Sequence, residues 1–169
     1  MAYIDYEYYK NLTGENSVSE LDFNRLVFDA CRKIDVMTTG ADSVKKLKVA
    51  FPTEEESIET VKRCVVAVVD IMDQIEKAEE NAKNAGGYVT REDGSLQGKV
   101  VSSVSAGSET IHYAVGNSTG SSTLIDKALS DKTLQDKLFR DTISEYLSGV
   151  TDANGVNLLY MGRYPYRVR

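Results

Sequence analysis

TEEESIETVKRCVVAVVDIMDQIEKAEENAK, residues 53–83, is the stretch that decides the fold class. Thr53 and Glu56 have the spacing of a capping box, which predicts a helix start near Glu54. The β-branched run at 65–69 resembles a strand, but the apolar period on both sides of it favours one long helix that packs against other helices. The residues that set this period are Ile58, Val61, Val65, Val68, Met72 and Ile75.

The same kind of pattern predicts another helix from about Glu20 to Met37. Ser19 is a favourable N-cap with Asp22 three residues later, and Gly40 is available for a left-handed cap after the last turn. We therefore predict a mainly α chain, a small helical bundle. The remaining helices are expected within 41–50 and at about Leu124 to Ser148, closed by Gly149.

The segment from Lys99 to Val115, KVVSSVSAGSETIHYAV, has the strand period on both sides of Ala106-Gly107 and predicts an inserted β-hairpin. A lone hairpin is marginally stable in water, so we expect it to contact other molecules. The alternative is that it packs on the helices of its own chain. Its candidate partner-interface residues are Val101, Val104, Ile111, Tyr113 and Val115.

The segment from Asn157 to Arg169, NLLYMGRYPYRVR, has no helical period. Tyrosine and arginine are enriched at interface centres, so we expect the last part of this extended tail, the arm RYPYRVR at 163–169, to order only on assembly. The alternative is a frayed terminus in water. The predicted organisation is a bundle at 1–149, with a hairpin protruding at about 99–115, and a tail at 150–169. The candidate interface residues of the tail are Leu158, Leu159, Tyr160, Arg163, Tyr164, Tyr166, Arg167 and Arg169.

The composition favours a protein without catalytic chemistry. The chain has 169 residues and a net charge of -6, so non-specific DNA binding is disfavoured. His112 is the only histidine, and no phosphate-binding or zinc-protease motif is present. We expect no enzyme activity, no cofactor and no metal ion. Neither a signal peptide nor a membrane span is expected.

Several individual side chains have ordinary structural interpretations. Cys31 and Cys64 lie on apolar helix sides, which predicts buried thiols. The N-terminal tyrosines, Tyr9 among them, suit half-buried positions with the hydroxyl in water. Asp70 and Asp73 are interpreted as a solvated helix face.

Four stretches, taken in order, resemble the head-tail connector proteins, or adaptors, of long-tailed bacteriophages and prophages. They are YIDYEYYKNLTG at 3–14, LDFNRLVFDACRKIDVMT at 21–38, VVSSVSAGSETIHYA at 100–114, and LSGV followed by NLLYMG at 147–162. Proteins of this family are small helical bundles that form a ring, commonly twelve-membered, beneath the portal of the DNA-filled head. The resemblance implies that helices beginning near Glu20, Glu54 and Asp131 build the bundle.

The resemblance also implies a location and a set of partners. The location is the virion neck, after assembly in the bacterial cytoplasm. The partners are the portal protein, neighbouring copies of the same chain, and the next neck or tail-completion protein. Genome DNA would pass through the ring without sequence-specific binding, and no membrane is involved. The alternatives are a head-closure or tail-completion ring protein, a DNA-packaging or regulatory DNA-binding protein, and an unrecognised enzyme.

Overall fold

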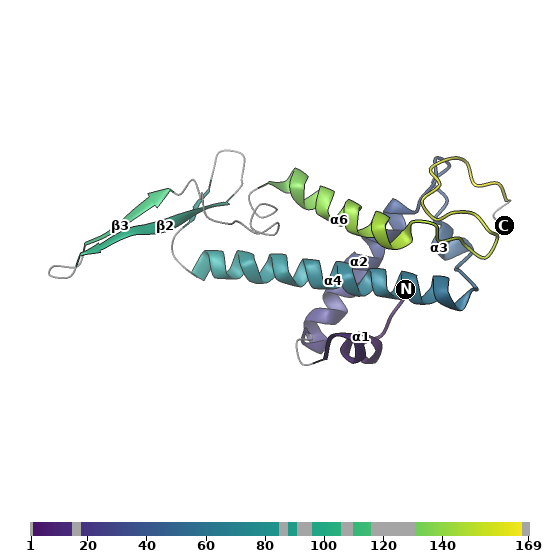
Figure 1. Cartoon of the computed structure of the whole chain (residues 1–169), viewed down its shortest axis with the longest axis horizontal. Coiled ribbons are helices and arrows are strands. Elements are labelled where there is room, and N and C mark those ends of the chain that lie inside the picture. The colour runs from purple at the N-terminus through teal and green to yellow at the C-terminus, as the bar shows by residue number, and fades with distance from the viewer. Residues whose placement is uncertain are drawn as a thin grey trace. The chain divides into compact units, whose positions relative to one another are not determined.

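The computed structural model describes residues 2–14, 18–84, 88–90, 96–105, 110–115 and 131–166 (Figure 1). Between residues 81 and 130 only the backbone of a helix end and three strands is described. The chain divides into two compact units. Unit 1 comprises Met1–Asp73 and Phe139–Arg169, and unit 2 comprises Gln74–Leu138.

The described residues are mainly helical, which confirms the predicted class. The helices are α1 (Tyr6–Thr13), α2 (Glu20–Met37), α3 (Lys46–Val49), α4 (Glu55–Asn84) and α6 (Lys132–Leu147). Helices α1, α2 and α3 belong wholly to unit 1, whereas α4 and α6 each begin in one unit and end in the other.

Helix α2 has the predicted bounds, and its start has the predicted cap. The Ser19 hydroxyl accepts a hydrogen bond from the Asp22 amide at 3.2 Å. The expected left-handed cap at Gly40 is wrong, because the helix ends at Thr38 with φ of -95°. Gly40 instead allows a close backbone approach. A Cβ atom at this position would lie 2.6 Å from the Gly162 carbonyl oxygen.

The starts of α4 and α6 differ slightly from the predictions. Helix α4 begins at Glu55, where the Ile58 amide donates to the Glu54 carbonyl at 2.9 Å. The Asp131 carboxylate caps α6 by accepting from the Thr133 amide at 2.7 Å. Gly149, at φ of +81°, closes this helix as expected. Residues 124–130 of the predicted last helix lie outside the described residues.

The core of unit 1 forms where the apolar faces of α2, α4 and α6 meet. The two cysteines are buried, as predicted, at 4% and 0% exposure. They act as small apolar side chains, and burial raises the pKa of the Cys64 thiol to about 12. Other buried members are Phe23, Leu26 and Ile34 of α2, Val61, Val65, Val68 and Val69 of α4, and Ile143 and Leu147 of α6.

Helix α1 is attached to the core by Tyr9. Its ring is fully buried and lies 5.0 Å from the Phe23 ring, and its hydroxyl donates to the Asp70 carboxylate at 2.6 Å. The expectation of a hydroxyl in water is therefore wrong for Tyr9. The solvated-face interpretation is likewise wrong for Asp70, because the buried phenol needs an acceptor on α4.

Unit 2 contains a three-stranded antiparallel sheet in the order β1-β2-β3. The strands are β1 (Tyr88–Thr90), β2 (Leu96–Ser105) and β3 (Thr110–Val115). Between β2 and β3, Val101 is paired with Tyr113 and Val104 with Ile111, with a register irregularity between Val101 and Ser103. The link through Ala106-Gly107 lies outside the described residues, so an inserted hairpin that contacts partners stays a prediction.

Replacing Tyr9 with phenylalanine should lower the free energy of unfolding by about 1.5–3 kcal/mol, since it removes a buried hydrogen bond to a charged group. Urea denaturation measures this loss. Tyr6→Phe is the matched control. It removes a hydrogen bond from the Tyr6 hydroxyl to the neutral Val18 carbonyl at 3.1 Å, and it should cost less. Equal losses for the two variants would contradict this account of Tyr9.

Candidate functional site

The C-terminal residues 150–166, here called the docked segment, fold back on their own unit. Leu158 is fully buried and Tyr164 is 7% exposed. The expectation that the arm at 163–169 orders only on assembly is therefore wrong for its described part, 163–166. Buried side chains and backbone groups of the same chain already hold them. The sequence did not indicate these contacts, because the segment has no helical period.

A single buried lysine holds the middle of the docked segment. The Lys46 ammonium donates to the Leu158 carbonyl at 2.8 Å and to the Tyr160 carbonyl at 2.5 Å. Burial lowers the pKa of Lys46, and the charges of Asp152 and Asp42 oppose that shift. One ammonium group thereby joins Lys46 to Leu158 and Tyr160, which follow it by 112 and 114 positions in the sequence.

The loop after α2 holds the next part of the docked segment. The Ala41 amide donates to the carbonyls of Met161 and Gly162, at 3.1 and 3.3 Å. The Asp42 carboxylate accepts from the Tyr164 amide at 2.9 Å, and this hydrogen bond is the main reason that the pKa of Asp42 is lowered. Together with the close approach at Gly40, these contacts fix the backbone from 161 to 164.

Asp152 organises the turn at the start of the docked segment. One carboxylate oxygen accepts from the amides of Asn154 and Val156, each at 2.9 Å. The other accepts from the Tyr164 hydroxyl at 2.6 Å. Burial, and then the hydrogen bond to Asp152, raise the pKa of Tyr164. The turn and the chain end are therefore connected through one buried carboxylate.

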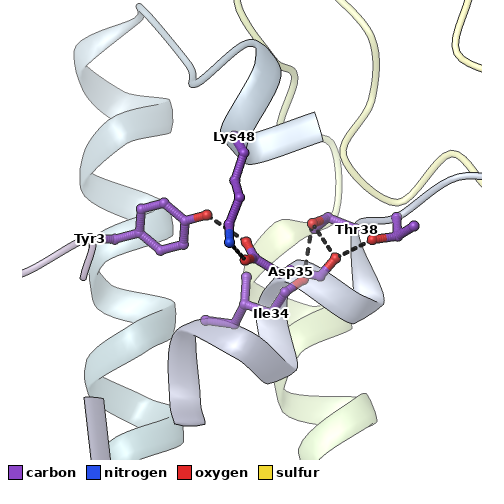
Figure 2. A network of polar contacts seen from close by, with 6 residues as sticks. Tyr3, Ile34, Asp35, Thr38 and Lys48 are labelled. Carbon is purple, nitrogen blue, oxygen red and sulfur yellow. Dashed lines mark hydrogen bonds and ion pairs between the residues drawn. The ribbon is translucent and has the colours of Figure 1, made fainter. Parts of the chain in front are cut away.

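A second buried carboxylate, Asp35, fixes the elements that hold the docked segment (Figure 2). One of its oxygens accepts a hydrogen bond from the Tyr3 hydroxyl at 2.5 Å, and the other pairs with the Lys48 ammonium at 3.1 Å. The Thr38 hydroxyl donates to the Ile34 carbonyl at 2.9 Å and closes the last turn of α2. The N-terminal segment, the end of α2 and α3 are thus tied together at one point.

The outer face of the docked segment carries large side chains in water. Tyr160 is 49% exposed, Met161 63% and Tyr166 52%, and Arg163 is also exposed. The Tyr166 ring lies edge-on to the buried Tyr164 ring at 5.9 Å, so it has a fixed support. We call these four exposed residues the outer face. Tyrosine, methionine and arginine are the residue types enriched in interface cores.

The predicted tail residues therefore divide into groups. Leu158 and Tyr164 are buried in their own chain, and Leu159 is half-buried. Tyr160, Arg163 and Tyr166 are exposed members of the outer face, whereas Arg167 and Arg169 lie outside the described residues. No pattern in the sequence indicated Met161 or the residues that hold the segment, which are Lys46, Asp42, Asp152 and Gly40.

The predicted interface residues of the strands are described only by their backbone. Val101 and Val104 lie on β2, and Ile111, Tyr113 and Val115 lie on β3, where Val115 is paired with Lys99. Their side chains are outside the part of the chain that the structure describes. Their role at an interface stays a prediction.

Within the described ranges, no group of three or more histidine, cysteine, aspartate or glutamate side chains is arranged to hold a metal ion. None of the described helices has the length and apolar character needed to cross a membrane. The arrangement of the docked segment is suited to presenting a surface, because Lys46, Asp42 and Asp152 hold its backbone while Tyr160, Met161 and Tyr166 are exposed.

Comparisons with family models, with curated proteins and with solved structures found no match to this chain.

Replacing Lys46 with methionine should loosen the docked segment, because two buried carbonyls lose a charged donor at a cost of about 2–3 kcal/mol. Amide hydrogen exchange at 158–164 should accelerate at least tenfold. Lys45→Met is the matched control, since the Lys45 side chain is exposed and one residue away. Unchanged protection in Lys46→Met would contradict the central role of this lysine.

Acid should weaken the contact between Asp42 and Tyr164. Because the pKa of Asp42 is lower when the segment is docked, its stabilisation is complete above the unfolded value of about 3.9. It is lost as the pH falls through the folded value. The Tyr164 amide resonance in an NMR titration should shift with a midpoint below pH of about 4. Asp42→Asn should abolish this shift, and a midpoint above the unfolded value would refute the assignment.

Proposed function

We propose that this chain is a structural protein of a phage or prophage neck, a head-tail connector adaptor. Copies of it form a ring below the portal, extend the DNA channel and join the head to the tail. The observation that carries the proposal is the outer face, an aromatic, methionine and arginine surface on a segment that is already ordered. The ordered resemblance of four sequence stretches to connector proteins supports the same function.

The docked segment is suited to binding a large partner. Association costs free energy when loops and side chains must be ordered, and a backbone held by Lys46 and Asp42 has already lost that freedom. Tyr160, Arg163 and Tyr166 are of the types that dominate binding hot spots. The outer face is therefore the part of unit 1 that we assign to the portal or to another neck protein.

The inserted hairpin of β2 and β3 is the second contact element in this proposal. Strands add to neighbouring molecules through main-chain hydrogen bonds, with alternate side chains giving specificity. In the ring, Val101, Val104, Ile111, Tyr113 and Val115 would face neighbouring copies or the next ring. The outer face and the hairpin would then serve different partners.

The charge of the chain agrees with a channel component. A net charge of -6 disfavours tight contact with phosphates, so DNA passing through the ring would not be held. No sequence-specific DNA contact is part of the proposal.

The test is attachment to purified portal rings encoded by the same genome, measured by co-sedimentation. The double variant Tyr160→Ala with Tyr166→Ala should bind at least tenfold more weakly, because each hot-spot residue contributes about 2 kcal/mol. Its helical circular dichroism should match that of the unmodified chain. Truncation at 163 is less informative, because it also removes the buried Tyr164.

Lys10→Met is the control for the portal experiment, because the Lys10 side chain is exposed on α1, a helix that lies well apart from the docked segment in Figure 1. It should attach as the unmodified chain does. If the unmodified chain does not attach to the portal, or if the double variant attaches equally well, the proposed function or its outer-face assignment is wrong.

A further inference from the structure

The outward side of α2 exposes large apolar side chains that unit 1 does not cover. Leu21 is 83% exposed, Phe28 63% and Val36 64%. These values match or exceed that of Met161, the most exposed apolar side chain of the docked segment. The opposite side of the same helix is buried through Phe23, Leu26 and Ile34 and belongs to the core.

The exposed positions form one stripe with two arginines. At 3.6 residues per turn, positions 21, 25, 28, 32 and 36 fall within about 80° of one another on the helix surface. Arg25 and Arg32 therefore lie between the apolar residues. We call Leu21, Arg25, Phe28, Arg32 and Val36 the α2 stripe. Asp22 and Asp29 border it, and Asp22 lies 3.8 Å from Arg25 in an exposed pair of the kind that contributes little stability.

The start of α4 offers a surface of opposite character. A shallow hollow there is lined by Glu54, Glu55, Glu56, Ile58, Glu59 and Lys62, and we call it the α4 hollow. Four of its six residues are acidic, and Ile58 is a partly exposed apolar side chain. The Lys62 ammonium lies 5.1 Å from the centre of the Tyr8 ring, and so has a partner in its own chain.

We propose that the α2 stripe of one copy docks on the α4 hollow of a second copy of this chain. Phe28 would contact Ile58 of the next copy, and Arg25 and Arg32 would face Glu55 and Glu56. Charge complementarity selects this occupant, because the chain itself carries an acidic, partly apolar surface that matches a basic, apolar stripe. The proposal deepens the proposed function by naming a contact between neighbouring copies, but it does not depend on portal binding.

The charges also decide the kind of symmetry. Two α2 stripes placed against each other would oppose arginine with arginine, and two α4 hollows would oppose glutamate with glutamate. The favourable contact joins two different surfaces, so it is heterologous, and repeated use of it closes a ring when the rotation allows. In such a ring each copy binds one neighbour through its α2 stripe and the other neighbour through its α4 hollow.

The test is a charge exchange followed by sedimentation equilibrium from about 1 μM to 1 mM, the range of moderate to weak affinity. One variant carries Arg25→Glu and Arg32→Glu. The other carries Glu55→Arg and Glu56→Arg. Circular dichroism verifies that both variants remain helical. Glu54 and Glu59 are left unchanged, because they accept hydrogen bonds from Ser57 and Arg63 of their own chain.

The unmodified chain should associate with itself, and each variant alone should associate at least tenfold more weakly. An equimolar mixture of the two variants should restore association, since every contact between unlike copies then joins opposite charges. A chain with all four substitutions should also associate. The inference is overturned if the unmodified chain stays monomeric throughout, if either variant associates normally, or if the mixture does not restore association.

The two proposals fail in different ways. Loss of portal attachment with intact charge-dependent self-association would reject the adaptor function and keep the contact between α2 and α4. Portal attachment by a chain whose self-association ignores the exchanged charges would reject the contact and keep the adaptor function.

Discussion

The Lys46 ammonium is the contact on which the surface of unit 1 depends. It donates hydrogen bonds to two carbonyls of a segment in which no helix or sheet supplies donors. A buried carbonyl without a donor costs free energy of folding. A neutral side chain of the same length would leave both carbonyls unpaired. The lysine is tolerated in the core because Asp42 and Asp152 supply compensating charge nearby. The shape of the outer face thus follows from one buried cation.

The support for that cation extends through the fold in a chain of contacts. Asp35 closes the end of α2 and holds Lys48 of α3, so the loop at 38–45 has both of its ends fixed. That loop presents Ala41 and Asp42 to the docked segment. The core packing of α2 against α4 and α6 sets the position of the whole arrangement. Substitutions far from the outer face would therefore change the positions of Tyr160 and Tyr166.

Helices with strong local signals were predictable from the sequence, and contacts between distant segments were not. Ser19 and the apolar period gave the bounds of α2, because capping and amphipathicity are local properties. Lys46 stands between Lys45 and Lys48, and only the tertiary fold distinguishes it from them. Gly40 was misinterpreted as a helix cap for the same reason, since its real neighbour, Gly162, is far away in the sequence. The docked segment has no helical period in its sequence. Its backbone hydrogen-bonding groups are paired with loop backbone and side chains and not within a helix.

The long sequence separation of these contacts has a consequence during synthesis. The ribosome makes Lys46 more than one hundred residues before Leu158, its carbonyl partner. The helices of unit 1 that precede α6 can begin to fold while that partner is still being translated. A nascent chain that stops early would lack Leu158 and Tyr164, so the apolar surface that these side chains cover in the folded unit would remain in water. Prematurely terminated products would therefore be less stable than the full chain and more susceptible to proteolysis.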